Sequence, residues 1–250
     1  MKIKLFILSL LVFLPVWLVA QNDVKTQADE AYKQEDYRQA AELYESLLAE
    51  GVEAHEVYYN LGCAYFRMNE LGLSIVNFER AQRLKPADKD TRENLELCYS
   101  RTQDHIEQLP QSLVSMWWQR LVMLFSPHQW YGLLLLMVLL VCVLVVWFML
   151  SSELRQRRAT LIASVIAVVL MLVVVGCAIQ SGHNANSHSE AVVMRAMTTV
   201  KASPDGGSND KFTLHEGTKV KVEETLGDWL RIRIADGNNG WLRAEEVELI

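Results

Sequence analysis

Residues 62–86 read GCAYFRMNELGLSIVNFERAQRLKP, and they repeat the pattern of the segment that lies 34 positions earlier. Ala28, Ala31, Ala40 and Tyr44 align with Gly62, Tyr65, Ser74 and Phe78, and Ala81 and Pro86 follow. Small residues let two helices approach closely, aromatic residues fill the space beside them, and a proline ends the unit. The stretch therefore predicts stacked helical hairpins.

Turn residues such as Gly51 and Asn69 separate five predicted helices. We expect these helices at Val24–Gln34, Tyr37–Leu48, His55–Met68, Leu71–Leu84 and from Asp88 to about Ile106. The last one aligns with the first helix of each hairpin, because Tyr99 repeats the position of Tyr65 at the same offset. Its other faces are charged, as suits a helix that caps an array. We therefore predict helical repeats with a capping helix over residues 24–108.

This period and pattern resemble those of tetratricopeptide (TPR) repeats. The resemblance implies a scaffold that binds protein or peptide on a concave surface lined by the first helix of each repeat. The aligned positions hold Tyr32, Lys33, Tyr59, Phe66, Arg67 and Arg101. The aromatic residues would supply apolar area and the basic residues would pair with an acidic peptide end. The alternative is that Tyr59 and Phe66 pack between the helices.

One subclass of TPR proteins binds chaperone tails through a clamp for two carboxylates. Lys25 and Asn60 match the pattern of that clamp, but Asp29, Asp90 and Asn94 stand at its other positions. We therefore do not expect recognition of that C-terminal tail.

Three apolar blocks raise the hydrophobic content to 51%. Residues 1–20 begin with a basic region and continue as an apolar run, which predicts a secretory signal peptide, with an uncleaved anchor as the alternative. Residues 131–150 and 159–179 carry no formal charge, and each is long enough to cross a hydrocarbon core about 30 Å thick.

The segment between these two spans, residues 151–158, carries Arg155, Arg157 and Arg158. Positive charge favours the cytoplasmic side, so this basic turn places both large hydrophilic parts in the periplasm of an inner-membrane protein. Both parts are acidic, with 18 acidic against 10 basic residues over 21–110 and 11 against 8 over 181–250. Neither has the basic stripe of a nucleic-acid-binding domain.

The first span follows an amphipathic segment, residues 109–130, that contains Trp117 and Trp118. Tryptophan at this place predicts an interfacial anchor along the membrane surface. A binding surface for a second membrane protein is the alternative. Residues 181–190, after the second span, form a polar linker.

Residues 191–250 change to a β pattern. Short segments rich in β-branched and aromatic residues at Ala191–Lys201, Thr218–Glu223 and Trp229–Ile234 are separated by turn clusters. Charged and apolar residues alternate along them, as in strands with one buried face. Roughly 60 residues of closely spaced strands predict a small all-β barrel.

This segment resembles a bacterial SH3 domain. The residues that carry the resemblance are Pro204, Gly217-Thr218-Lys219-Val220, Gly227-Asp228-Trp229-Leu230-Arg231-Ile232, Asp236-Gly237 and Gly240-Trp241-Leu242. The resemblance implies that Trp229 lies over the barrel and that Gly240 and Trp241 open a strand after a tight hairpin.

The order of signal, TPR repeats, double span and SH3 domain resembles the BatE family of the aerotolerance operon of Bacteroidetes. The run RTQDHIEQLP at residues 101–110, with Trp117 and Trp118 after it, carries the same resemblance. It implies a membrane assembly encoded beside a MoxR-type ATPase and von Willebrand A-domain proteins. It also implies a link to tolerance of oxygen or stress, without established enzymatic activity.

No catalytic motif stands out: the chain has no Gly-x-Ser-x-Gly, His-Glu-x-x-His, phosphate loop or Cys-x-x-Cys. No metal or cofactor is expected, and Cys63 and Cys98 are interpreted as packed thiols, with a disulfide as the alternative. The sequence predicts a non-catalytic membrane adaptor, because a catalytic cleft would have to be built from two small domains on separate tethers. The alternative is a protein whose SH3 domain binds peptidoglycan and anchors it to the cell wall.

Overall fold

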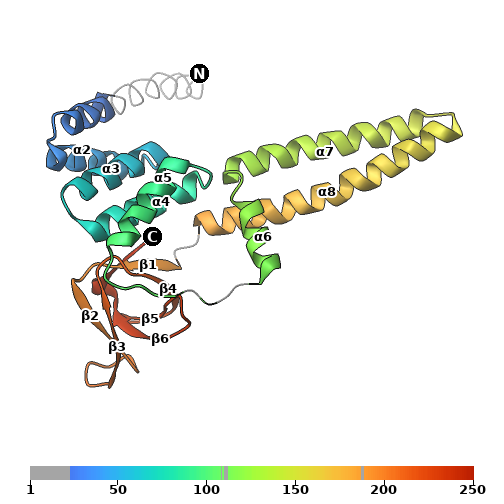
Figure 1. Cartoon of the computed structure of the whole chain (residues 1–250). Coiled ribbons are helices and arrows are strands. Elements are labelled where there is room, and N and C mark those ends of the chain that lie inside the picture. The colour runs from blue at the N-terminus through green and yellow to red at the C-terminus, as the bar shows by residue number, and fades with distance from the viewer. Residues whose placement is uncertain (1–22, 108, 110–111, 187–188) are drawn as a thin grey trace, which may run out of the picture. The chain divides into compact units, whose positions relative to one another are not determined.

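The computed structural model describes residues 23–107, 109, 112–186 and 189–250, so the predicted signal peptide lies outside the described residues (Figure 1). The chain divides into two compact units. One unit combines the N-terminal helices with the C-terminal strands, and the other contains the two long apolar helices.

The N-terminal helices follow the predicted hairpins. A helix over residues 23–33 is followed by α2 (Tyr37–Ala49), α3 (His55–Arg67), α4 (Leu71–Leu84) and α5 (Lys89–Arg101). The turns within the two hairpins place Glu35 and Asn69 at φ 64° and 63°, and these residues are 34 positions apart. The same backbone turn therefore recurs once per repeat.

Packing between the helices explains the small residues. A Cβ atom on Gly62 would lie 2.9 Å from the Phe78 ring, and the Ser74 hydroxyl donates to the Gly62 carbonyl at 2.9 Å. The repeat register extends to α5. Tyr65 donates to Glu45, and Tyr99 donates to Glu79 at 2.5 Å, with each pair 20 residues apart. Helix α5 thus stands where a third repeat would begin, as predicted.

Helix α5 ends at Arg101, earlier than the predicted end near Ile106. Residues 102–107 leave the helix and run along the C-terminal strands. The Asp104 carboxylate accepts hydrogen bonds from the His215 backbone N–H and the Thr218 hydroxyl, both at 2.7 Å, and Ile106 packs on the core of the sheet. These contacts replace the helical hydrogen bonds that the segment would otherwise make.

The C-terminal residues form one antiparallel sheet of seven strands, in the order β3-β2-β6-β5-β4-β1-β7. The strands are β1 (Glu190–Val193), β2 (Met197–Lys201), β3 (Asp210–His215), β4 (Lys219–Leu226), β5 (Trp229–Arg233), β6 (Asn239–Arg243) and β7 (Val247–Leu249). The all-β prediction is confirmed. The predicted strand at 191–201 is in fact two strands, β6 contains the strand that the SH3 resemblance implied at Gly240 and Trp241, and β3 and β7 were not predicted.

The prediction of a closed barrel is wrong, because β3 and β7 are the two edges of the sheet and do not pair. Unpaired backbone groups at an edge need other partners. The helical part supplies them: Asp104 accepts from the His215 N–H of β3, and Arg80 of α4 donates to the Leu249 carbonyl of β7 at 2.7 Å. The edges are thus capped by side chains rather than joined to each other.

The helices and the sheet pack as one unit. Ile75, Val76 and Cys98 share a buried cluster with Val192 and Ile250 from the sheet. A Cβ atom on Gly217 would lie 2.8 Å from Thr102 and 2.9 Å from Ile75, so the backbone there approaches the helices closely. The helices and the sheet therefore belong to one compact unit.

The second unit contains α6 (Leu113–Val122), α7 (Pro127–Leu150) and α8 (Leu154–Asn186). Helices α7 and α8 lie side by side as a hairpin (Figure 1). Both are long and apolar enough to cross a membrane. They extend beyond the predicted spans, so the three arginines predicted in the turn lie in the first turns of α8.

Candidate functional site

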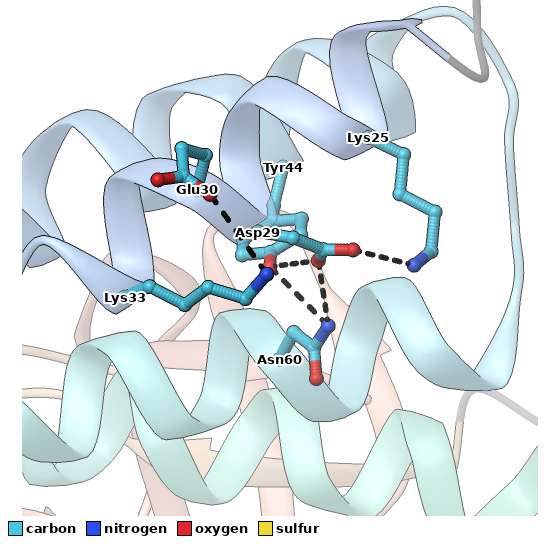
Figure 2. Close-up of polar contacts among 6 residues, drawn as sticks. All are labelled: Lys25, Asp29, Glu30, Lys33, Tyr44 and Asn60. Atoms are coloured by element: carbon cyan, nitrogen blue, oxygen red, sulfur yellow. Dashed lines mark hydrogen bonds and ion pairs between the residues drawn. The ribbon is translucent and has the colours of Figure 1, made fainter.

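The most connected polar cluster among the described repeats centres on Asp29 (Figure 2). Its carboxylate accepts from the Tyr44 hydroxyl at 2.6 Å, from Lys25 Nζ at 3.0 Å and from Asn60 Nδ2 at 3.2 Å. Burial raises the pKa of Asp29, but the hydrogen bonds from Tyr44 and Lys25 outweigh burial and hold this pKa below its ordinary value. Asp29 is therefore a structural anion that ties three helices together.

The second repeat carries a related cluster. Asn94, which aligns with Asn60 in the next repeat, donates to the Tyr59 hydroxyl at 3.0 Å and contacts Cys63 Sγ at 3.9 Å. Lys25 and Asn60, which match the two-carboxylate clamp, thus contact Asp29, and Asn94 contacts its own neighbours.

Tyr59 and Phe66 are half-buried. Both pack against the buried cluster that contains Phe78 of α4 and Leu95 of α5. The Tyr59 ring lies 6.0 Å from the His55 ring and 5.7 Å from the Phe78 ring. Burial and the neighbouring Cys63 raise the pKa of Tyr59 to about 12, so its hydroxyl stays protonated at neutral pH. Each ring thus has one part between helices and one part at the surface.

The three basic positions differ in their contacts. Lys33 is exposed and lies 3.8 Å from Glu30 of its own helix. Arg67 lies beside the Tyr32 hydroxyl, and hydrogen bonding to Tyr32 raises the pKa of Arg67. Arg101 places its guanidinium 4.3 Å from the centre of the Phe66 ring, a cation–π contact.

The SH3-type positions lie on β5 and β6. Trp229 is half-buried, and Arg243 lies 5.2 Å from the centre of its ring. Trp241 is paired with Lys201 on one side and with Arg231 on the other. A Cβ atom on Gly240 would overlap the Val200 side chain, so glycine is required where β6 meets β2.

The two tryptophans of α6 have different surroundings. A Cβ atom on Gly176 of α8 would lie 3.0 Å from the Trp118 ring, so this ring packs closely on α8. Trp117 is 71% exposed. Of the arginines in α8, Arg155 and Arg158 are exposed, and Arg157 lies 4.9 Å from the centre of the Phe148 ring.

Cys63 and Cys98 are free thiols. Burial raises the pKa of both, to about 11 for Cys63, which leaves them protonated and unreactive at neutral pH. Within the described ranges, no group of three or more His, Cys, Asp or Glu side chains could hold a metal ion.

Sequence reasoning missed the polar contacts between the helices and the sheet. Lys219 of β4 donates to Glu79 of α4 at 2.9 Å and lies 3.0 Å from Glu190. Glu216 accepts from the Gly72 N–H at the start of α4 at 2.8 Å. Lys219 and Glu79 are 140 residues apart along the chain, and Gly72 and Glu216 are 144 residues apart. No repeat or motif connects the members of either pair.

Comparison with known families gives one match. Residues 55–88 match the tetratricopeptide repeat family, and this range coincides with α3, α4 and the turn after them. A search of curated proteins finds no match to this chain. A TPR repeat indicates a role in protein–protein interaction, and TPR units are typically non-catalytic. The chain thus contains a TPR repeat at residues 55–88.

Proposed function

We propose that this protein is a non-catalytic scaffold that binds protein partners through the face formed by the first helices of its repeats. This first-helix face consists of Tyr32, Lys33, Tyr59, Phe66, Arg67 and Arg101. The match of residues 55–88 to the TPR family carries the proposal. The contacts of Tyr59 and Phe66 support it, because half-buried rings offer apolar area while they remain fixed by the core.

The scaffold is held in the inner membrane by α7 and α8, with the repeats and the sheet both in the periplasm. The packing of the repeats on the sheet supports this topology, because parts that precede and follow a two-helix hairpin lie on one side when the hairpin crosses twice. Arg155, Arg157 and Arg158 support a cytoplasmic turn. Trp117 and Trp118 would anchor α6 at the interface.

The resemblance to the BatE family extends the proposal to an assembly that serves tolerance of oxygen or envelope stress. The partners would be membrane proteins with von Willebrand A domains. That extension rests on the order of segments and on residues 101–110 and 117–118.

Crosslinking in intact cells, followed by affinity purification and mass spectrometry, tests the first-helix face. Wild type is compared with a Tyr59→Ala/Phe66→Ala variant and with a Trp229→Ala variant as a matched control on the sheet. A stoichiometric partner that is recovered with wild type and the control, but lost with the double variant, supports the proposal. Recovery of the same partner from wild type and from both variants contradicts it.

A second candidate function is attachment to the cell wall through the sheet. Trp229 with Arg243 and the flanked Trp241 form an aromatic and basic surface of a kind that stacks on sugars. Because the sheet packs on the helices, the full chain in detergent is the appropriate sample for co-sedimentation with purified sacculi. Sedimentation that is lost in Trp229→Ala/Trp241→Ala would favour this candidate.

A further inference from the structure

The three cations of the first-helix face occupy one repeated position. Lys33, Arg67 and Arg101 follow each other at the repeat interval, and each is the last residue of a first helix. Equivalent positions of adjacent repeats lie on neighbouring helices, whose axes are about 10 Å apart. We call this set the basic row.

Aromatic rings of the preceding repeat position the two arginines of the row. Arg67 lies beside Tyr32, and Arg101 lies over Phe66. Tyr32 and Phe66 are themselves one repeat apart, but their contacts differ: Arg67 hydrogen-bonds to the Tyr32 hydroxyl, whereas Arg101 lies over the Phe66 ring. A guanidinium that rests on a ring keeps its N–H groups directed outward and loses less conformational freedom on binding an anion.

Both arginines are exposed. Within the part of the chain that the structure describes, no ion pair joins Arg67 or Arg101 to a carboxylate. Carboxylates on the same helices have other contacts: Asp29 accepts from Lys25, and Glu93 pairs with Lys89 at 3.1 Å. Arg67 and Arg101 are thus available positive charges on a repeat region that is acidic as a whole, whereas Lys33 lies 3.8 Å from Glu30.

A cation at the end of a helix also interacts favourably with the helix dipole. That effect alone would serve the second helices equally; α2 has no basic residue in its last turn, whereas α4 has Arg83 there. The dipole also requires no aromatic partner beside the guanidinium. The aromatic contact that each arginine makes with the preceding repeat is therefore better explained by a ligand.

We propose that the partner bound by the first-helix face is a segment rich in carboxylates that lies across the repeats, with acidic groups opposite Arg67 and Arg101. This inference rests on the proposed function and specifies its ligand. A segment in the polyproline II conformation has three residues per turn and covers about 9 Å in three residues, so carboxylates three positions apart lie on one face and match the spacing of the row. Guanidinium groups bind carboxylates in a bidentate manner, which favours arginine at these positions.

Fluorescence anisotropy with the full chain in detergent tests the inference. The probe is a labelled 12-residue peptide with Glu at every third position and Leu between, and its counterpart has Gln in place of Glu. Each is made with a free and an amidated C-terminus, which separates side-chain carboxylates from a terminal one. We expect the Glu peptide to bind at least about tenfold more tightly than the Gln peptide, and Arg67→Glu/Arg101→Glu to abolish that preference.

Arg38→Glu/Arg92→Glu is the matched control, because it changes the same charge at exposed positions outside the row. Thermal unfolding followed by circular dichroism verifies that each variant is folded, and Arg67→Gln/Arg101→Gln replaces the Glu variant if it is not. Equal binding of both peptides, or an equal loss in the control variant, overturns the inference. If the crosslinked partner is lost with Tyr59→Ala/Phe66→Ala but retained with Arg67→Glu/Arg101→Glu, the acidic ligand is wrong and the binding face stands. If both double variants retain it, the binding face itself is wrong.

Discussion

Two polar clusters in the first unit contrast in how they are built. The Asp29 cluster joins helices that follow each other in the chain, with partners at most 31 residues away (Figure 2). The Glu79 cluster joins α4 to β1 and β4, with Lys219 140 residues away. The first joins the first repeat to the start of the second, whereas the second joins the sheet to the helices. Contacts between neighbours in the chain thus hold the helices together, and contacts between distant segments hold the sheet against the last helices of the array.

The largest effect is expected from Lys219→Ala. This change leaves the Glu79 carboxylate, whose side chain is only 7% exposed, without its cation. We expect a loss of about 3 kcal/mol in the free energy of unfolding, at the lower end for a broken buried pair because Lys219 itself is partly exposed. Urea unfolding followed by circular dichroism measures the loss. Lys221→Ala, an exposed lysine of the same strand, should change little, and an equal loss there would remove the special role of the Glu79 cluster.

Gly217→Ala should have the next largest effect, at about 2 kcal/mol. Gly217 has φ +85°, and its new methyl group would also lie 2.8 Å from Thr102 and 2.9 Å from Ile75. Gly227→Ala is the control, because Gly227 has φ +59° with no atom within 4 Å of the added carbon. The excess loss at Gly217 isolates the packing of the sheet on the helices. Equal losses at both glycines would mean that this packing contributes little in solution.

Tyr44→Phe tests the local cluster and should cost about 1.5 kcal/mol, between the values of one and two hydrogen bonds. The ring is buried, so the variant keeps the packing and loses the hydroxyl that donates to Asp29 and accepts from Asn60. Phe78 occupies the equivalent place in the second repeat, which indicates that the backbone accepts phenylalanine there. Hydrogen exchange read by mass spectrometry should show faster exchange in residues 23–49 and unchanged exchange in the strands. Faster exchange in the strands as well would mean that the two clusters act as one.

The contrast also explains what could be predicted from the sequence. The repeat offset aligns Gly62 with Ala28 and Tyr99 with Tyr65, so the helices, their turns and the basic row follow from the chain alone. Nothing in the residues near Asp104 indicates that it binds His215, so the end of α5 was placed too late. Closely spaced strands predicted a small barrel. Strand spacing carries no information about side chains that cap an edge, so the open sheet could not be predicted. Contacts between distant segments require the folded chain.

The smallest effect is on the pH dependence of stability. It compares Asp29, within the repeats, with Asp104, which contacts the strands. The pKa of Asp29 in the folded protein lies below its unfolded value, so its contribution to stability is fully present above the unfolded pKa. That contribution is lost as the pH falls through the folded pKa. Asp104 has the same sign, because the hydrogen bonds from Thr218 and His215 outweigh its burial and lower its pKa.

Asp29→Asn and Asp104→Asn should therefore each be less stable than wild type at neutral pH, and each difference should shrink in acid. Urea unfolding at neutral and acidic pH measures both differences. Hydrogen exchange then assigns each loss to a region, and we expect the repeats to respond to Asp29→Asn and the strands to Asp104→Asn. A difference that persists unchanged in acid would mean that the carboxylate acts through its shape rather than its charge. Because Asn keeps one acceptor oxygen, that outcome would mean that positions 29 and 104 need a hydrogen-bond acceptor of the right shape and not a negative charge.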